Sequence, residues 1–129
     1  MKYILFTLLI TFSSCSKNND INIVSNNLEG KWIEFEARMD TLYFQPFDNK
    51  NSMKLNRGKE IINGYLLPKY GSGYYRYYID AEKIYLNSAF SSDSNYKDYF
   101  FKISGDTLFI GNFYNSILGK NLTFIKLGN

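Results

Sequence analysis

The sequence predicts an all-β fold, a single small antiparallel up-and-down barrel of about eight strands. Aromatic residues make up 19% of the chain, with 12 Tyr and 11 Phe among 129 residues, and such side chains favour the pleated surface of a sheet. Short alternating segments recur between Gly, Pro, Asn and Asp turn signals, and none shows a helical period of helical length. Sequential strands usually pair, and closing the sheet removes its exposed edges.

Residues 1–14 predict a signal peptide. Lys2 gives a positive start, and residues 4–12 (ILFTLLITF) form an apolar run too short to span a bilayer. Two small Ser residues then precede Cys15. This order resembles the lipobox of bacterial lipoproteins, although Phe12 stands where Leu is usual. The resemblance implies a lipid on Cys15 and an outer-membrane location, on the periplasmic face or at the cell surface.

Two other interpretations of this leader stay open: an ordinary secretory signal with a chance Cys, or a buried N-terminal strand. Residues 15–27 are rich in Ser, Asn, Lys and Asp and predict a flexible tether, unless 21–24 form an additional edge strand. Residues 28–129 then make one folded domain. Since Cys15 is the single Cys, the chain can form no intramolecular disulfide.

The first half of the domain begins with an alternating segment, 31–37, which places Trp32, Glu34 and Glu36 on one face. Pro46 cannot donate to a ladder, so the next strand has it at an edge or end. A turn over 48–51 and Arg57-Gly58 separate the strands that follow. The strands predicted here are 31–37, 41–47, 52–56 and 60–66.

The second half opens with a loop over 68–73 that contains two Gly. A hairpin then turns at Asp80-Ala81-Glu82, a polar loop covers 91–95, and a second hairpin turns at Gly105-Asp106. The strands predicted here are 73–80, 83–88, 96–104, 107–113 and 121–127.

A family resemblance accompanies this order of strands. Leu28-Glu29-Gly30-Lys31-Trp32 resembles the L-x-G-x-W opening of lipocalin-like proteins. The later pattern of strands and turns, including 78–86, 99–108 and 122–126, is similar to that of lipocalin-like lipoproteins of Bacteroidota. The resemblance covers about residues 28–127 and implies a lipocalin-like barrel whose interior holds side chains or one small ligand. Trp32 would then contribute to a ligand site or simply fill the core.

Catalytic chemistry finds little support in the composition. The chain has no His, which removes the commonest general base and metal ligand. Glu34, Glu36 and Asp40 lie close in sequence, and paired carboxylates serve glycosidases, but a solvated strand face is the simpler interpretation. The net charge of +3 is well mixed, unlike the basic stripe of nucleic-acid binders. We expect no enzyme, cofactor, metal or nucleic-acid partner, and a solvated turn at Arg57.

The segment 68–78 (PKYGSGYYRYY) is the densest in aromatic residues. A Gly-rich loop beside tyrosines and cations suits sugar stacking or an aromatic patch for a protein partner. Alternation puts Tyr74, Arg76 and Tyr78 on one face and Tyr75 and Tyr77 on the other, so a Tyr-rich core strand is the competing interpretation. The candidate ligand-binding residues are Trp32, Tyr70, Tyr74, Arg76 and Tyr78.

Two similar stretches begin Asp-Thr-Leu, at 40–42 and 106–108. Asp turns the chain and Thr-Leu begins a strand in the simpler interpretation. The pattern also resembles the O-glycosylation site of exported Bacteroidota proteins, which implies sugar on Thr41 or Thr107.

Two functions remain in competition. The first is a lipid-anchored, non-catalytic binding module for a small apolar or glycan ligand. The second is an interaction or structural lipoprotein with a filled barrel, which binds an envelope protein partner through its outer face. Large inward aromatics decide between an interior cavity and a filled core, and the many Tyr and Phe favour a filled interior.

Overall fold

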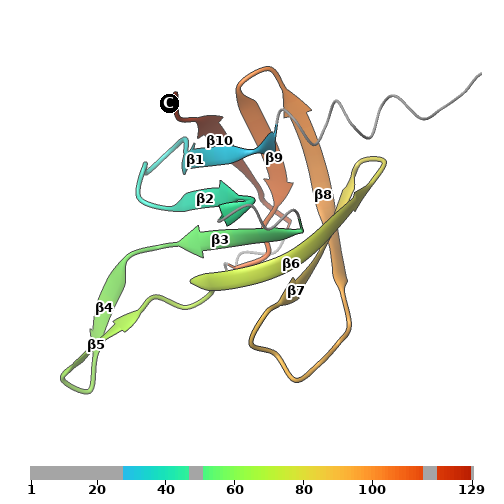
Figure 1. Cartoon of the computed structure of the whole chain (residues 1–129). Helices are drawn as coiled ribbons and strands as arrows, with labels where there is room; N and C mark the ends of the chain where they lie inside the picture. The colour runs from blue at the N-terminus through green and yellow to red at the C-terminus, as the bar shows by residue number, and fades with distance from the viewer. Residues whose placement is uncertain (1–27, 47–50, 115–118, 129) are drawn as a thin grey trace, which may run out of the picture.

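Short alternating segments of the chain form the predicted antiparallel barrel, which the computed structural model confirms (Figure 1). The structure describes residues 28–46, 51–114 and 119–128, so the signal peptide 1–14, Cys15 and the tether 15–27 lie outside the described residues. Around the closed barrel the neighbouring strands are β1-β10-β9-β8-β7-β6-β3-β2, and β4 and β5 form a separate two-stranded sheet. The strands are β1 Gly30–Glu34, β2 Thr41–Phe44, β3 Ser52–Asn56, β4 Lys59–Ile62, β5 Tyr65–Pro68, β6 Gly73–Asp80, β7 Lys83–Ser88, β8 Lys97–Ser104, β9 Thr107–Gly111 and β10 Asn121–Lys126.

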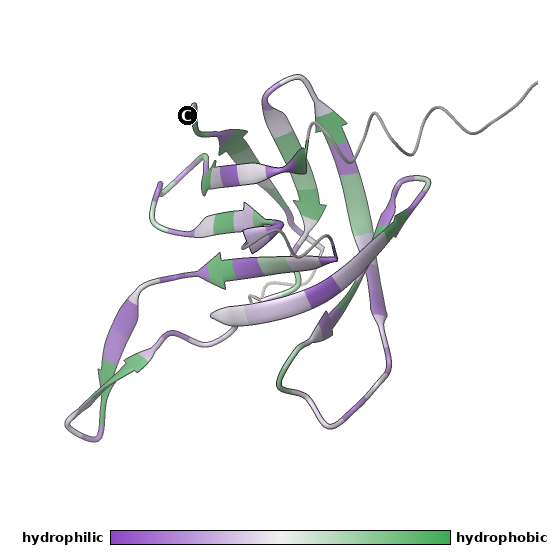
Figure 2. Ribbon diagram, in the orientation of Figure 1, coloured by the Kyte–Doolittle hydropathy of each residue, from purple (hydrophilic) through white to green (hydrophobic). Residues whose placement is uncertain are grey.

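The interior of the barrel is packed with large side chains from alternate positions of its strands. Figure 2 shows this alternation as bands of apolar and polar residues along the barrel strands. Trp32, Phe44 and Phe124 are the largest of the fully buried side chains. Burying a side chain of this size contributes about 1.5–3 kcal/mol. The core consists of Leu28, Trp32, Leu42, Phe44, Met53, Leu55, Tyr77, Ile84, Leu86, Phe101, Leu108, Ile110, Tyr114, Leu122 and Phe124.

Trp32 lies within this core and has its polar atom satisfied. Its indole N–H donates a hydrogen bond to the carbonyl oxygen of Leu28 at 2.9 Å. The Lys126 ammonium lies 5.4 Å from the centre of the ring. Trp32 therefore fills the barrel, which is the simpler of its two predicted roles.

The long hairpin of β6 and β7 has the predicted bounds and the predicted faces. Tyr77 is buried and meets Phe44 edge to face, with ring centres 5.4 Å apart. Tyr75 is half-buried and packs against the same core. The outward face of β6 carries the other three candidates, Tyr74, Arg76 and Tyr78.

The predicted strand 60–66 is wrong, because the chain turns in its middle. β4 and β5 pair with each other in register from Lys59–Pro68 to Ile62–Tyr65. Asn63 and Gly64 join them with positive φ angles of 53° and 83°, which are the requirements of a type I′ hairpin turn. β3 consequently pairs with β6, and the hairpin projects from the barrel (Figure 1).

The predicted solvated role of Glu34 is also wrong. Its side chain is only 9% exposed, and its carboxylate accepts hydrogen bonds from the backbone N–H groups of Glu36, Ala37 and Arg38 at 2.9, 2.6 and 3.1 Å. These bonds fold the chain into a turn, so β1 ends at Glu34 and not at residue 37 as predicted. The Glu34 carboxylate thus accepts the hydrogen bonds of backbone N–H groups that have no partner in the sheet.

Candidate functional site

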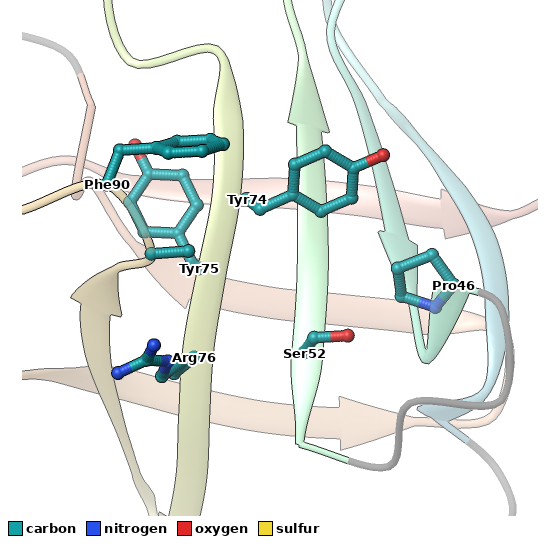
Figure 3. A pocket seen from close by; sticks show the side chains of 7 residues that line it. Pro46, Ser52, Tyr74, Tyr75, Arg76 and Phe90 are labelled. Carbon is teal, nitrogen blue, oxygen red and sulfur yellow. The ribbon is translucent and has the colours of Figure 1, made fainter.

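A groove of about 420 Å³ crosses the outer face of the barrel over β3 and β6 (Figure 3). Small-ligand sites typically enclose about 300–1,000 Å³, so the groove has room for one or two sugar-sized rings. Its lining residues are Pro46, Ser52, Tyr74, Tyr75, Arg76, Ala89 and Phe90.

The register between β3 and β6 builds the floor of this groove. Ser52 lies opposite Arg76 and Lys54 lies opposite Tyr74, so these residues share the outward face. The Lys54 ammonium is 5.2 Å from the centre of the Tyr74 ring, within the range of a cation–π contact. This contact helps to fix the ring across the neighbouring strand.

Phe90 forms an aromatic wall on the other side of β6 (Figure 3). Its ring meets Tyr74 edge to face, with centres 6.5 Å apart, although the side chain is 82% exposed. The backbone N–H of Ala89 donates to the carbonyl oxygen of Tyr74 at 2.8 Å and holds this segment against β6. Phe90 is a site residue that the strand pattern does not predict; its one local signal is a large apolar side chain beside the polar loop 91–95.

A buried amide holds the rest of this loop. Asn87 is buried, and its side-chain nitrogen donates to the carbonyl oxygens of Asp93 and Asn95, each at 2.8 Å. Asn87 lies opposite Arg76 in the β6–β7 pairing, so it lies on the outward face of the barrel. The loop therefore folds over that face, beside the groove.

The electrostatics of the groove favour an anion. Arg76 is exposed and forms no ion pair with any residue that the structure describes. No Asp or Glu is among the described residues that line the groove. Arg76 lines the groove together with Tyr74 and Phe90, and Figure 3 shows its side chain extending to the opposite side of β6 from Tyr74.

Tyr75 lines the inner side of the groove and is fixed by its hydroxyl. The hydroxyl donates to the carbonyl oxygen of Gly71 at 2.6 Å. Burial raises the pKa of this phenol above its ordinary value, so it stays protonated near neutral pH. Tyr75 therefore supplies a rigid wall and no acid–base chemistry at that pH.

The predicted ligand residues do not form one site. Tyr74 and Arg76 line the groove. Tyr78 continues the outward face of β6, where its ring stacks on Tyr85 with centres 4.4 Å apart. Trp32 is buried in the core, and Tyr70 is 80% exposed in the segment that follows β5.

The two candidate glycosylation residues, Thr41 and Thr107, begin β2 and β9, and both are half-buried. Thr41 lies between Ile33 and Asn56 of the neighbouring strands. Glycosylation at these positions remains a prediction.

A charged network closes one end of the barrel. It corrects the predicted solvated turn Arg57-Gly58-Lys59-Glu60 at its first residue: the last three residues are exposed, but the Arg57 side chain is only 20% exposed. Arg57 Nε lies 3.2 Å from Asp40 Oδ2, and its Nη1 donates to the carbonyl oxygen of Tyr70 at 2.8 Å. The guanidinium also lies 4.7 Å from the centre of the Tyr114 ring. Asp40 and Arg57 are thus structural partners and not parts of a catalytic pair with Glu34.

Tyr114 is the buried centre of this network, only 3% exposed. Burial, and then the nearby Asp40 carboxylate, raise the pKa of its phenol far above the ordinary value. Gly71 packs directly on Tyr114: a Cβ atom at Gly71 would lie 2.7 Å from the Tyr114 Cβ, and the φ angle there is +82°. Gly is required for both reasons.

The described residues contain neither a cluster of metal-binding side chains nor a membrane-spanning helix. In that part of the chain, no group of three or more His, Cys, Asp or Glu side chains could hold a metal ion. No helix within the described ranges has the length and apolar character needed to cross a membrane.

Comparisons with protein-family models, curated proteins and solved structures found no match to this chain.

Proposed function

We propose that this chain is a lipid-anchored envelope protein that acts as a non-catalytic binding module for an acidic glycan, held in the outer groove. The supporting observation is the combination of two aromatic walls, Tyr74 and Phe90, with Arg76, which forms no ion pair with any described residue. Aromatic faces pack on the apolar faces of sugar rings, and a guanidinium binds a carboxylate through two parallel hydrogen bonds. A uronic acid unit has both features.

The packed interior favours the outer groove over a ligand inside the barrel. Trp32, Phe44 and Phe124 occupy the inside of the barrel and are fully buried. A ligand there would have to displace side chains whose burial stabilises the fold. The outer groove requires no such rearrangement.

The anchor is proposed from the leader. Cys15 carries the lipid, and residues 15–27 connect it to the barrel over at most about 45 Å when fully extended. Acyl chains stabilise membrane attachment by about 0.8 kcal/mol for each buried CH₂ group. Metabolic labelling with a fatty-acid probe tests this directly: the wild-type chain should be labelled and Cys15→Ser should not. An unlabelled wild-type chain would contradict the anchor.

The glycan proposal is tested by calorimetric titration of the intact protein with oligogalacturonate and with a neutral oligosaccharide of equal length. We expect saturable binding of the acidic sugar, weakened about tenfold or more by Arg76→Gln, because a charged hydrogen-bonded contact contributes about 1.5–3 kcal/mol. Tyr74→Ala should weaken binding of the acidic sugar as well.

Tyr43→Ala is the matched control, because Tyr43 carries a similar cation–π contact, with the Lys31 ammonium 5.5 Å from its ring centre. Tyr43 lies on β2, outside the groove, and its replacement should leave binding unchanged. Equal affinity for the acidic and neutral sugars, or equal losses in Tyr43→Ala and Tyr74→Ala, would contradict the proposal.

A further inference from the structure

The hairpin of β4 and β5 is the most exposed apolar element that the structure describes. All residues of both strands are exposed, including Ile61 at 75% and Leu66 at 61%. Figure 2 shows apolar colouring on both strands, where they project away from the barrel. Exposed apolar surface of this kind marks an interaction site.

Neither face of the hairpin is covered by the part of the barrel that the structure describes. Ile61 and Leu66 are cross-strand partners on one face, and Ile62 and Tyr65 are partners on the other. An isolated two-stranded hairpin is only marginally stable in water. A third strand would cover apolar side chains and complete the hydrogen bonding of an edge.

The backbone of the two edges differs. In a two-residue hairpin the residues that flank the turn form a hydrogen-bonded pair, and the pattern alternates along the strands. By this alternation Gly58 and Lys69 should form a hydrogen-bonded pair, and the Lys69 N–H does donate to the Gly58 carbonyl oxygen at 3.1 Å. The N–H and C=O groups of Lys59 and Ile61 therefore point outward from β4.

The same alternation turns Leu66 and Pro68 outward from β5. Pro68 has no N–H group, so the β5 edge lacks one donor, whereas the β4 edge offers a donor and an acceptor at both Lys59 and Ile61. Of the two edges, β4 is the better template for an added strand.

We propose that the β4 edge is a docking site for an extended segment of a partner protein, which adds to the hairpin as a third strand. Main-chain hydrogen bonds to Lys59 and Ile61 would supply affinity, and alternate side chains would supply specificity. Cross-strand complementarity calls for apolar residues opposite Ile61 and Ile62, an acidic residue opposite Lys59 and a basic residue opposite Glu60.

Charge argues against a second copy of this chain as the occupant. In a dimer, two β4 strands would pair antiparallel about a two-fold axis. All the outward N–H and C=O groups of Lys59 and Ile61 form hydrogen bonds when Lys59 of each copy lies opposite Ile61 of the other. That register places the two Glu60 carboxylates directly opposite each other, which is destabilising. A segment of opposite charge pattern avoids this repulsion.

The position of the hairpin leaves it accessible. β1 begins beside Phe44, at the far end of β2, whereas the hairpin follows Asn56, which pairs with Thr41 at the start of β2. The described chain therefore begins at one end of the barrel and the hairpin leaves at the other. The docking edge is also separate from the glycan groove, so the two proposals can fail independently.

The test is selection of short random peptides, displayed on phage, against the intact protein. Selected peptides should bind Ile61→Pro about tenfold more weakly than Leu66→Pro, the effect of losing one main-chain hydrogen bond. The two variants are matched, because Ile61 and Leu66 are cross-strand partners and each Pro removes one outward N–H and one exposed apolar side chain.

A second measurement guards against a Pro that unfolds the hairpin. Two N-methylated forms of a selected peptide are compared, one methylated at its odd-numbered residues and one at its even-numbered residues. One form should lose binding and the other should keep it, because only one edge of an added strand bonds to β4. Arg76→Gln should not alter peptide binding. Several outcomes would overturn the proposal: no enrichment, peptides insensitive to both Ile61→Pro and N-methylation, or a dimer in sedimentation that dissociates in Ile61→Pro.

Discussion

The barrel and the β4–β5 hairpin are built from the same kinds of residue and hold them in opposite environments. In the barrel, alternation directs Leu, Ile and aromatic side chains into one interior, where fifteen of the described hydrophobic residues are buried. In the hairpin, Ile61, Ile62, Tyr65, Leu66 and Leu67 are all exposed. Barrel strands are therefore stabilised by shared burial, whereas the hairpin depends on its turn and on two short strands. We expect stability and interaction to be separable along this boundary.

The largest expected effect is in the barrel core. Trp32→Ala removes a fully buried indole and its hydrogen bond to Leu28, and should lower the free energy of unfolding by about 3–5 kcal/mol. Urea denaturation followed by tyrosine fluorescence measures this change. Ile61→Ala is the hairpin control and should change the midpoint little. A loss below about 1 kcal/mol in Trp32→Ala would show that the core is not tightly packed there.

The next effect concerns the turn that ends β1. Glu34→Ala removes a carboxylate that accepts three backbone hydrogen bonds, and should cost about 2–3 kcal/mol. Glu36→Ala is the matched control: Glu36 is exposed and, among the described residues, its carboxylate pairs with Lys120 at 2.9 Å, which is worth at most about 1 kcal/mol. Urea midpoints for the pair decide the point, and equal losses would contradict the capping role of Glu34.

The distance along the chain between interacting residues explains which features the sequence could predict and which it could not. β3, β6 and β7 have the predicted bounds, because alternation and turn residues are local signals. The outward placement of Tyr74 and Arg76 follows from the same alternation. The buried role of Arg57 depends on Asp40, seventeen positions away, and local patterns do not contain this information. The carboxylate of Glu34 bonds to backbone groups only two to four residues ahead, but alternation alone predicts that the strand continues there.

The hairpin was missed for a different reason. Its turn signal, Asn63-Gly64, is local and strong, but the flanking apolar pairs do not alternate, so 60–66 resembled one buried strand. Phe90 was missed because its contact with Tyr74 depends on the closing of β7 against β6. The register of the closed barrel brings the groove together, and that register is a tertiary property.

Two glycines provide a further contrast between the regions. Gly71 and Gly64 have nearly equal φ angles, +82° and +83°, but a Cβ atom would strike Tyr114 at Gly71 and would meet open space at Gly64. Gly71→Ala should therefore cost about 2 kcal/mol or more in global stability, from backbone strain and displacement of Tyr114. Gly64→Ala should loosen only the hairpin. Hydrogen exchange separates the two: a global loss of protection in Gly64→Ala would show that hairpin and barrel unfold together.

The pH dependence of stability tests the closed end of the barrel. Because the pKa of Tyr114 is raised in the folded state, the unfolded chain releases that proton first, near pH 10. Stability from this group is complete below about pH 10 and falls as the pH rises above it. Between about pH 9.5 and 11, the wild type should lose about 1 kcal/mol more than Tyr114→Phe. Parallel curves for the two proteins would place the Tyr114 phenol in solvent.

The smallest expected effect is in the hairpin itself, where Ile61→Thr combined with Leu66→Thr replaces one cross-strand pair of exposed side chains. Thr keeps a high strand propensity, so the hairpin should persist and the urea midpoint should stay within about 0.5 kcal/mol of the wild type. The selected peptides should nevertheless bind more weakly, because the apolar surface beside the β4 edge is reduced. A large loss of global stability would mean that the hairpin packs on the barrel, and the contrast between the two regions would then be incorrect.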